Sequence, residues 1–178
     1  MIQLDTSWLQ HVQKPARYTG GEYNSIVKDH STVDVTMALG FPDVYEVAMS
    51  HLGIKILYGL VNRREDAVAE RVFAPWHDME EEMRKRNIPL FSLETRTPIK
   101  DFDVLAFTLQ YEMSFTNILN MLDLAGIPMY AKERDLDFPL LVCGGPCAYN
   151  VEPIADFFDI VSLGESEEWG DEFIDLLK

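Results

Sequence analysis

Cysteine is scarce in this chain, whose 178 residues include only Cys143 and Cys147. Two thiols are too few for the disulfide framework of a small secreted protein. They are also too few for a complete iron–sulfur site, because a cluster usually takes three or four thiolates. A structural zinc ion needs about four ligands, and none of the four histidines has metal-ligand spacing to another. The sequence therefore predicts reduced thiols and no metal ligands.

Basic side chains are also few. Lys and Arg number 15 against 30 Asp and Glu, which gives a formal net charge of −15. Nucleic acid is a poor partner for such a chain, because phosphate binding needs a basic footprint. No apolar run approaches the ~20 residues of a membrane span, and the first residues lack the basic and apolar regions of a signal peptide. We expect a cytoplasmic protein that binds neither nucleic acid nor a membrane.

Three motifs that often carry chemistry are missing. The chain has no Gly-x-Gly-x-x-Gly after its first predicted strand and no Gly-x-x-x-x-Gly-Lys-Ser/Thr, which disfavours NAD and nucleoside triphosphate chemistry. It also has no Gly-x-Ser-x-Gly nucleophile elbow. We therefore predict no catalytic residue, with one alternative left open. Cys147 lies in a turn after an apolar run and would be a nucleophile if a base lay beside it.

Apolar runs alternate with helical patterns along most of the chain. Short runs predict strands at Val33–Leu39, Ala69–Phe73, Pro89–Glu94, Asp103–Leu109, Leu140–Cys143 and Asp159–Leu163. Helical patterns cover residues 43–61, 78–87, 114–125 and 167–177. This alternation predicts an α/β fold with a doubly wound, mostly parallel sheet of five or six strands, of the Rossmann or flavodoxin type. Val33–Leu39 and Asp103–Leu109 are nearly unbroken apolar runs, so we place them at its centre.

The first part of the chain lacks such a pattern. We expect residues 1–32 to form an N-terminal extension, anchored by Trp8 and Leu9, and residues 33–178 to form the domain. Gly40 to Pro42 is predicted to be the turn after the first strand. Asp43 and Glu46 then have the spacing of a helix-capping box. Gly53 is expected to interrupt the following helix, and Ser50 is a candidate cap for its second part.

Ligands of open α/β sheets lie at the carboxyl ends of the strands. Paired glycines after a strand either let a flat ligand approach the backbone or form a tight turn, and the sequence leaves both open. The predicted cofactor-binding residues follow three strands: Gly40, Phe41 and Pro42, then Thr108, Leu109 and Gln110, then Gly144, Gly145 and Pro146.

Several segments, taken in order, resemble one protein family. They are Lys14–Glu22, Phe41–Gly53, Arg71–Trp76, Thr108–Glu112, Cys143–Asn150 and Phe157–Glu165. Together they resemble the N-terminal cobalamin-binding-like domain of an uncharacterised family of radical S-adenosylmethionine (radical SAM) proteins. The resemblance implies that a barrel follows in the full protein. That barrel would bind S-adenosylmethionine and would carry a 4Fe–4S cluster on a Cys-x-x-x-Cys-x-x-Cys motif. This chain lacks that motif.

One departure concerns cobalamin. Domains that ligate cobalt use Asp-x-His-x-x-Gly, whereas Ser50-His51-Leu52-Gly53 has a different spacing and no Asp two residues before His51. We do not expect His51 to bind cobalt, so a corrinoid would bind without a protein ligand or the site would be vestigial. By default, the fragment alone is expected to carry no cofactor and to be inactive.

Three functions follow from these observations. The leading hypothesis is a domain that presents a corrinoid or a substrate to the barrel of the same polypeptide. The alternatives are a scaffold that only docks the barrel and a small standalone enzyme that uses Cys147. Homo-oligomerisation is left open.

Overall fold

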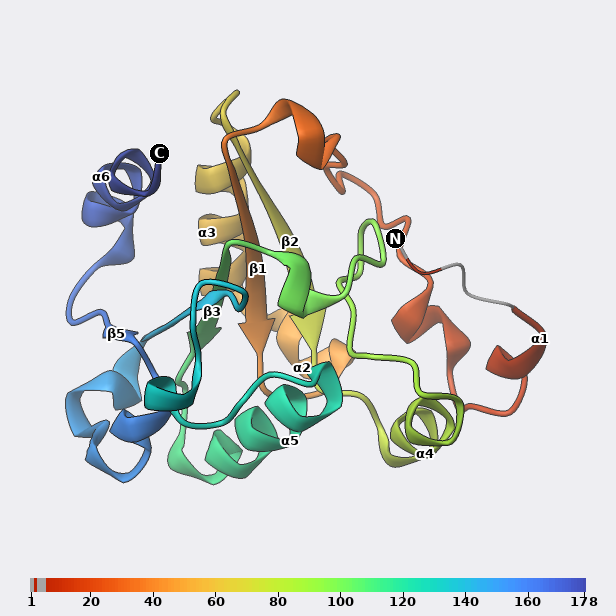
Figure 1. Ribbon diagram of the computed structural model, residues 1–178. Helices are drawn as coiled ribbons and strands as arrows, with labels where there is room; N and C mark the ends of the chain where they lie inside the picture. Colours follow the sequence, from red (N-terminus) through yellow and green to blue (C-terminus); the bar gives the residue numbers. More distant parts are fainter. Residues whose placement is uncertain (1, 3–5) are drawn as a thin grey trace.

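The computed structural model describes residues 2 and 6–178. In this part of the chain, five strands form one all-parallel sheet in the order β2-β1-β3-β4-β5 (Figure 1). Their bounds are β1 Val35–Phe41, β2 Ala67–Phe73, β3 Val104–Thr108, β4 Leu140–Gly144 and β5 Ile160–Val161. The prediction of a doubly wound α/β sheet is confirmed. The two strands that were expected at the centre, β1 and β3, each pair with a strand on both sides.

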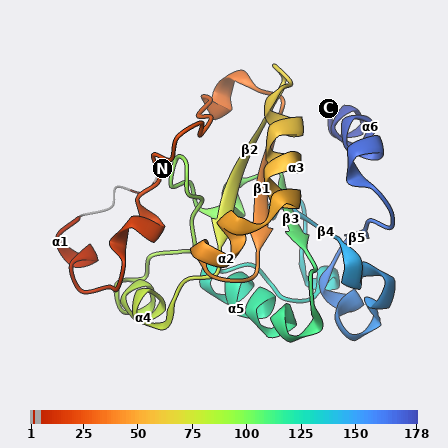
Figure 2. The same cartoon turned by 180° about the vertical axis from the view of Figure 1, so that it is seen from behind.

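Helices cover both faces of the sheet. The α-helices are α1 Thr6–Leu9, α2 Tyr45–Ser50, α3 Leu52–Asn62, α4 His77–Arg86, α5 Phe115–Ala125 and α6 Ser166–Leu177. Figure 2 shows α2 and α3 in front of the sheet, while α4 and α5 lie on the other face. Short 3₁₀ helices complete the connections at Pro15–Tyr18, His30–Thr32, Ile99–Asp101, Glu112–Ser114, Ala131–Glu133, Pro146–Asn150 and Glu152–Phe157.

Two apolar clusters, one on each face, hold these layers together. Alternate residues of β1 point to opposite faces, as the pleat of a strand requires. Met37 and Leu39 pack with α3 and α6, whereas Ala38 packs with the cluster that contains α4 and α5. All seven residues of β1 are buried, which explains why its sequence is apolar almost throughout. None of the described helices is both long and apolar enough to cross a membrane.

The predicted edge strand at Pro89–Glu94 is wrong. The structure has only one isolated antiparallel bridge there, between Phe91 and Pro98. The segment covers the free edge of β2 by other means: Leu93 N–H donates to Arg71 C=O at 2.7 Å, and the Glu94 carboxylate accepts Arg71 N–H at 2.7 Å. The Glu94 carboxylate accepts the Arg71 N–H that the backbone of a sixth strand would otherwise accept. The described sheet therefore has five strands.

The local predictions around the first helix also need correction. Gly40 and Phe41 are the last residues of β1 and not part of a turn. No capping box forms, because Val44 is the N-cap residue of α2 and Glu46 instead pairs with Lys14 and Arg17. The interruption near Gly53 is confirmed, since α2 ends at Ser50 and α3 starts at Leu52. The cap of α3 is His51 rather than Ser50.

Candidate functional site

The carboxyl edge of the sheet brings the three predicted segments together. Gly40 is paired with Phe107, and Thr108 with Gly144, so the ends of β1, β3 and β4 lie side by side. A cavity of about 240 Å³ is lined at this edge by Gly40, Thr108, Gln110, Gly144 and Gly145. The four remaining candidates do not line it: Phe41, Pro42 and Leu109 are buried, and Pro146 is exposed at the start of a 3₁₀ helix.

The cavity continues from the edge into the molecule between α3, α6 and one face of the sheet. Its floor is apolar and comes from alternate residues of three strands: Met37, Leu39, Ala106 and Val142. Its walls are Ile54, Leu57 and Val61 of α3 and Trp169, Phe173 and Ile174 of α6. None of the described lining residues is Lys or Arg, whereas Glu165 and Glu167 are among them. Such a lining suits an apolar, uncharged group better than a phosphate.

Glycines shape this end of the cavity for different physical reasons. Gly144 follows Val142 on the same face of β4, and a Cβ atom there would meet Ser162 at an ordinary 3.5 Å. A Cβ atom on Gly40 would lie 2.6 Å from the Phe107 ring, so packing alone requires glycine at that position. Gly145 has φ +103° and a Cβ atom there would lie 3.0 Å from the Leu109 carbonyl oxygen. Gly145 is therefore fixed by backbone conformation, and Gly144 is the glycine whose missing side chain leaves space in the cavity.

A chain of polar contacts crosses the mouth of the cavity. Ile54 N–H donates to His51 Nδ1 at 3.4 Å, which caps α3. Because Nδ1 accepts, Nε2 carries the proton and donates to Gln110 Oε1 at 3.1 Å. Gln110 Nε2 in turn donates to Thr108 Oγ1. Both ring nitrogens of His51 are thus engaged within the protein, and a free nitrogen for cobalt would require these contacts to break.

Two buried polar atoms beside the cavity have no hydrogen-bond partner among the described residues. They are Ser162 Oγ and Trp169 Nε1, and both residues line the cavity. A buried donor or acceptor without a partner costs about 1–3 kcal/mol, so such atoms are rare in native proteins without a reason. Sequence reasoning missed both residues. Trp169 was recognisable only as part of the apolar face of the last helix, and Ser162 only as one residue of the segment Phe157–Glu165 that carries the family resemblance.

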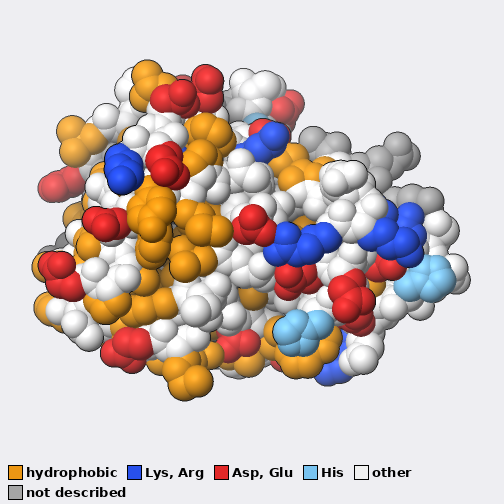
Figure 3. Space-filling model, turned by 60° about the horizontal axis from the view of Figure 1, so that its bottom comes forward, with side chains coloured by type: hydrophobic (Ala, Val, Ile, Leu, Met, Phe, Trp, Pro, Cys, Tyr) orange, Lys and Arg blue, Asp and Glu red, His pale blue; other side chains and the backbone are white. Residues whose placement is uncertain are grey.

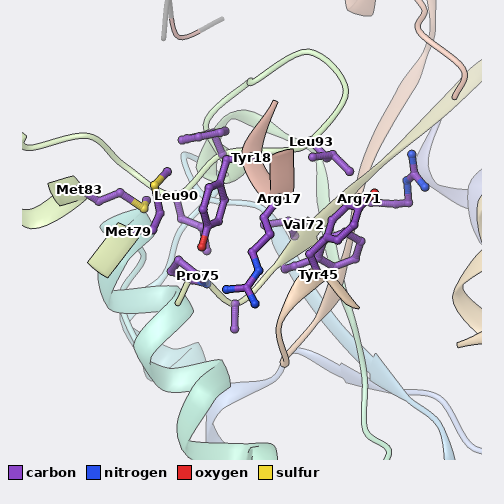
Figure 4. Close-up of a pocket in the computed structure, with 13 residues that line it drawn as sticks. Arg17, Tyr18, Tyr45, Arg71, Val72, Pro75, Met79, Met83, Leu90 and Leu93 are labelled. Carbon is purple, nitrogen blue, oxygen red and sulfur yellow. The ribbon is translucent and has the colours of Figure 1, made fainter. Parts of the chain in front are cut away.

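Residues 6–32, which were expected to form an extension, contact the rest of the chain at several points. Trp8 and Leu9 are buried, as predicted, and Tyr58 Oη accepts Ile26 N–H at 2.7 Å. Figure 4 shows Arg17 and Tyr18 reaching into a second, smaller cavity beside Pro75. That cavity measures about 30 Å³. A single water molecule needs about 10–15 Å³, so the space suits water and not a cofactor.

Comparison with known proteins places the chain in a family. Residues 53–178 match the family model described as "Radical SAM proteins, N-terminal". The chain belongs to this family. It is also 27% identical over 134 residues to a protein of Methanocaldococcus jannaschii named "Uncharacterized protein MJ0966". That match covers 74% of this chain and 24% of the archaeal protein, so the chain spans about a quarter of its curated relative.

The thiols of this radical SAM N-terminal domain are poor nucleophiles. Burial raises the pKa of Cys143 to about 12. The pKa of Cys147 is also raised, first by burial and then by the negative charge of Glu112 and a hydrogen bond to it. A reactive cysteine needs the opposite environment, with a positive charge or a base nearby. The geometry therefore opposes the alternative in which Cys147 performs catalysis.

The described part of the radical SAM N-terminal domain also offers no site for a 4Fe–4S cluster. Among the described residues, no group of three or more His, Cys, Asp or Glu side chains is arranged to hold a metal ion. The donor set of two thiols does not fit a 4Fe–4S cluster. The cavity, in contrast, has features that fit an organic cofactor, namely space beside Gly144 and two unpaired polar atoms.

Proposed function

We propose that this domain binds a corrinoid, or a substrate of similar planar chemistry, at the carboxyl edge of its sheet and presents it to a catalytic domain of the same polypeptide. The observation that carries the proposal is the cavity of about 240 Å³ at the ends of β1, β3 and β4, with Ser162 Oγ and Trp169 Nε1 unpaired beside it. Family membership supports the presence of a catalytic domain in the same polypeptide, because the matched model describes an N-terminal part of radical SAM proteins. The catalytic part would hold the 4Fe–4S cluster and S-adenosylmethionine.

Each group of residues would have a separate task. The backbone at Gly144 and Gly145 would allow close approach of a planar ligand. Ser162 and Trp169 would hydrogen-bond the part of the ligand that enters the cavity, and the apolar floor would exclude water from it. A bound corrinoid would supply a cobalt ion that carries an alkyl group or an electron. His51 would position Gln110 rather than bind the cobalt, because both its ring nitrogens already have partners.

The proposal is tested by titrating the protein with hydroxocobalamin and following the absorbance of the corrin ring. Gly144→Val places a branched side chain in the cavity, while β4 tolerates a β-branched residue. We expect the wild type to bind and Gly144→Val to bind at least about tenfold more weakly, a loss of about 1.4 kcal/mol. Gly59→Ala is the matched control, because a Cβ atom at Gly59 meets nothing within 4 Å and the residue does not line the cavity.

His51→Ala adds a test of cobalt ligation. We expect this variant to show the same visible spectrum when bound, because the cobalt would have no side-chain ligand. A changed spectrum with His51→Ala would mean that His51 binds the metal after all. Equal binding by the wild type and Gly144→Val would remove the cavity from the site, and no binding by the wild type would leave only the docking scaffold.

A further inference from the structure

Exposed apolar side chains follow the carboxyl end of every strand in the sheet. Val47 and Leu52 come after β1, Trp76 after β2, Tyr111 and Met113 after β3, Tyr149 after β4 and Leu163 after β5. We call these seven residues the apolar rim. Leu52, Met113, Tyr149 and Leu163 are between 61% and 85% exposed. Figure 3, in which the strand ends face the viewer, shows hydrophobic side chains gathered on this face.

Single exposed apolar residues are normal on a protein surface, but a set that lies on one face indicates a contact. The other large exposed apolar residues are spread over the extension, α3, the connection before β4, β5 and α6, as Tyr23, Val27, Ile56, Tyr130, Leu136, Ile160 and Leu176. The apolar rim is different because the segments that follow all five strands of the sheet, distant in sequence, each contribute to it.

Two of the segments that carry the rim, those after β1 and β3, are held together by hydrogen bonds. The Tyr111 hydroxyl donates to Asp43 Oδ2 at 2.9 Å, which ties the connection after β3 to the one after β1. Asn117 Nδ2 of α5 donates to the Pro42 carbonyl at 2.9 Å and ties that helix to the connection after β1. A surface that is already ordered loses less entropy when a partner binds. This part of the rim is therefore preformed for docking.

The charges around the rim restrict the partner. Exposed glutamates lie in the same connections as the apolar residues: Glu46, Glu112, Glu152, Glu165 and Glu167. Two basic residues of the N-terminal segment, Lys14 and Arg17, already pair with Glu46. A complementary partner has an apolar face with basic residues at its margin. A second copy of this chain, with a net charge of −15, would bring acidic margins together.

We infer that the apolar rim is the docking surface for the catalytic domain of the same polypeptide. The archaeal relative provides the room for such a domain, because this chain aligns with only 24% of it. The inference rests on the proposed function because it assumes that the catalytic domain exists, but it does not require that the cavity binds a ligand. A rim that docks the catalytic domain is compatible with an empty cavity, so the two proposals can fail separately.

The experiment is hydrogen–deuterium exchange on the full-length polypeptide and on residues 1–178 alone, both without added cofactor. We expect the connections that carry Met113, Tyr149 and Leu163 to exchange at least about tenfold more slowly in the full-length protein. The double variant Met113→Lys and Leu163→Lys should lose that protection. Both side chains are exposed, so circular dichroism of residues 1–178 should be unchanged. Leu136→Lys, also fully exposed but outside the rim, is the control and should keep the protection.

Three outcomes would overturn the inference. One is equal exchange of the rim in the long and short proteins, and another is protection confined to α4 and α5. The third is a dimer of residues 1–178 that dissociates in the double variant, because the apolar rim would then be the interface between two copies of this chain. Rim protection together with no binding of hydroxocobalamin would support the docking surface and count against the ligand proposal.

Discussion

At the scale of single residues, two neighbouring glycines illustrate how packing and function can be separated. Gly40 and Gly144 both lie at the carboxyl edge and both line the cavity. A Cβ atom at Gly40 would clash with the Phe107 ring at 2.6 Å, whereas one at Gly144 would make an ordinary contact with Ser162. From sequence alone the two positions look equivalent, since both follow apolar runs. Only the register of the sheet distinguishes them.

Gly40→Ala should therefore destabilise the protein by about 1–3 kcal/mol through overpacking. Gly144→Ala should leave the free energy of unfolding unchanged or raise it by up to about 1 kcal/mol, because alanine restricts the unfolded chain. Urea unfolding followed by circular dichroism measures both. Equal loss of stability in the two variants would show that the space beside Gly144 is smaller than the structure indicates.

The thiols allow a second test at this scale. Since the pKa of Cys143 is raised to about 12 and that of Cys147 is raised by burial and Glu112, both thiols stay protonated at pH 8. We expect iodoacetamide to leave Cys143 unmodified in the folded protein and to modify Cys147 slowly. Glu112→Gln should speed the reaction of Cys147 alone, because it removes a negative charge. Mass spectrometry of the digested protein reads both sites, and rapid alkylation of Cys143 would contradict its burial.

At the scale of elements, α6 is the least predictable and the most informative for the site. Its sequence predicts a helix, and the helix is there, but its role as a wall of the cavity depends on contacts across the fold. Arg64, after α3, lies 3.2 Å from Asp171 and 2.5 Å from Asp175, and it also pairs with Asp66. Lys178 joins Asp66 and Asp175. No sequence pattern shows that these charges, more than a hundred residues apart, meet.

Arg64→Ala should loosen α6 and open the cavity wall. Hydrogen exchange in residues 166–177 should become faster, whereas Arg63→Ala, at an exposed neighbouring position, should have no effect. The pKa values of Asp66 and Asp175 are lowered, mainly by hydrogen bonds from Arg64. A carboxylate whose pKa is lowered in the folded state stabilises the fold above its usual pKa, and this stabilisation is lost only as the pH falls through the folded-state pKa. The ion pairs of Arg64 with Asp66 and Asp175 should therefore persist at pH 5 and weaken in strong acid. Unchanged exchange in Arg64→Ala would mean that apolar contacts alone hold α6.

The same scale explains why the other local predictions differed from the structure. The strand expected at Pro89–Glu94 has the right composition, but the Glu94 side chain caps the edge of β2 in its place. The expected capping box failed because Glu46 faces Lys14 and Arg17, which lower its pKa to about 2. Both outcomes depend on residues of distant segments. Propensity and spacing do not contain that information.

At the scale of the whole molecule, the fold followed from the sequence more directly than the site did. The alternating strand and helix patterns were enough to predict a parallel sheet with β1 and β3 at its centre. They also placed Gly40, Thr108 and Gly144 at one edge, since parallel strands end together. The depth of the cavity and the unpaired atoms of Ser162 and Trp169 could not be predicted. They depend on where α6 packs, and helix packing is decided by the whole apolar surface.

The indole N–H of Trp169 is the best reporter of whether part of a ligand bound at the carboxyl edge enters the cavity between α3 and α6. The chain has three tryptophans, so its ¹H–¹⁵N spectrum contains three indole signals. On titration with hydroxocobalamin, we expect the Trp169 signal to shift together with the amides of Gly144, Gly145 and Ser162, while the signal of buried Trp8 stays in place. A Trp169 signal that does not move at saturating hydroxocobalamin, or shifts confined to other parts of the domain, would show that the cavity takes no part in binding.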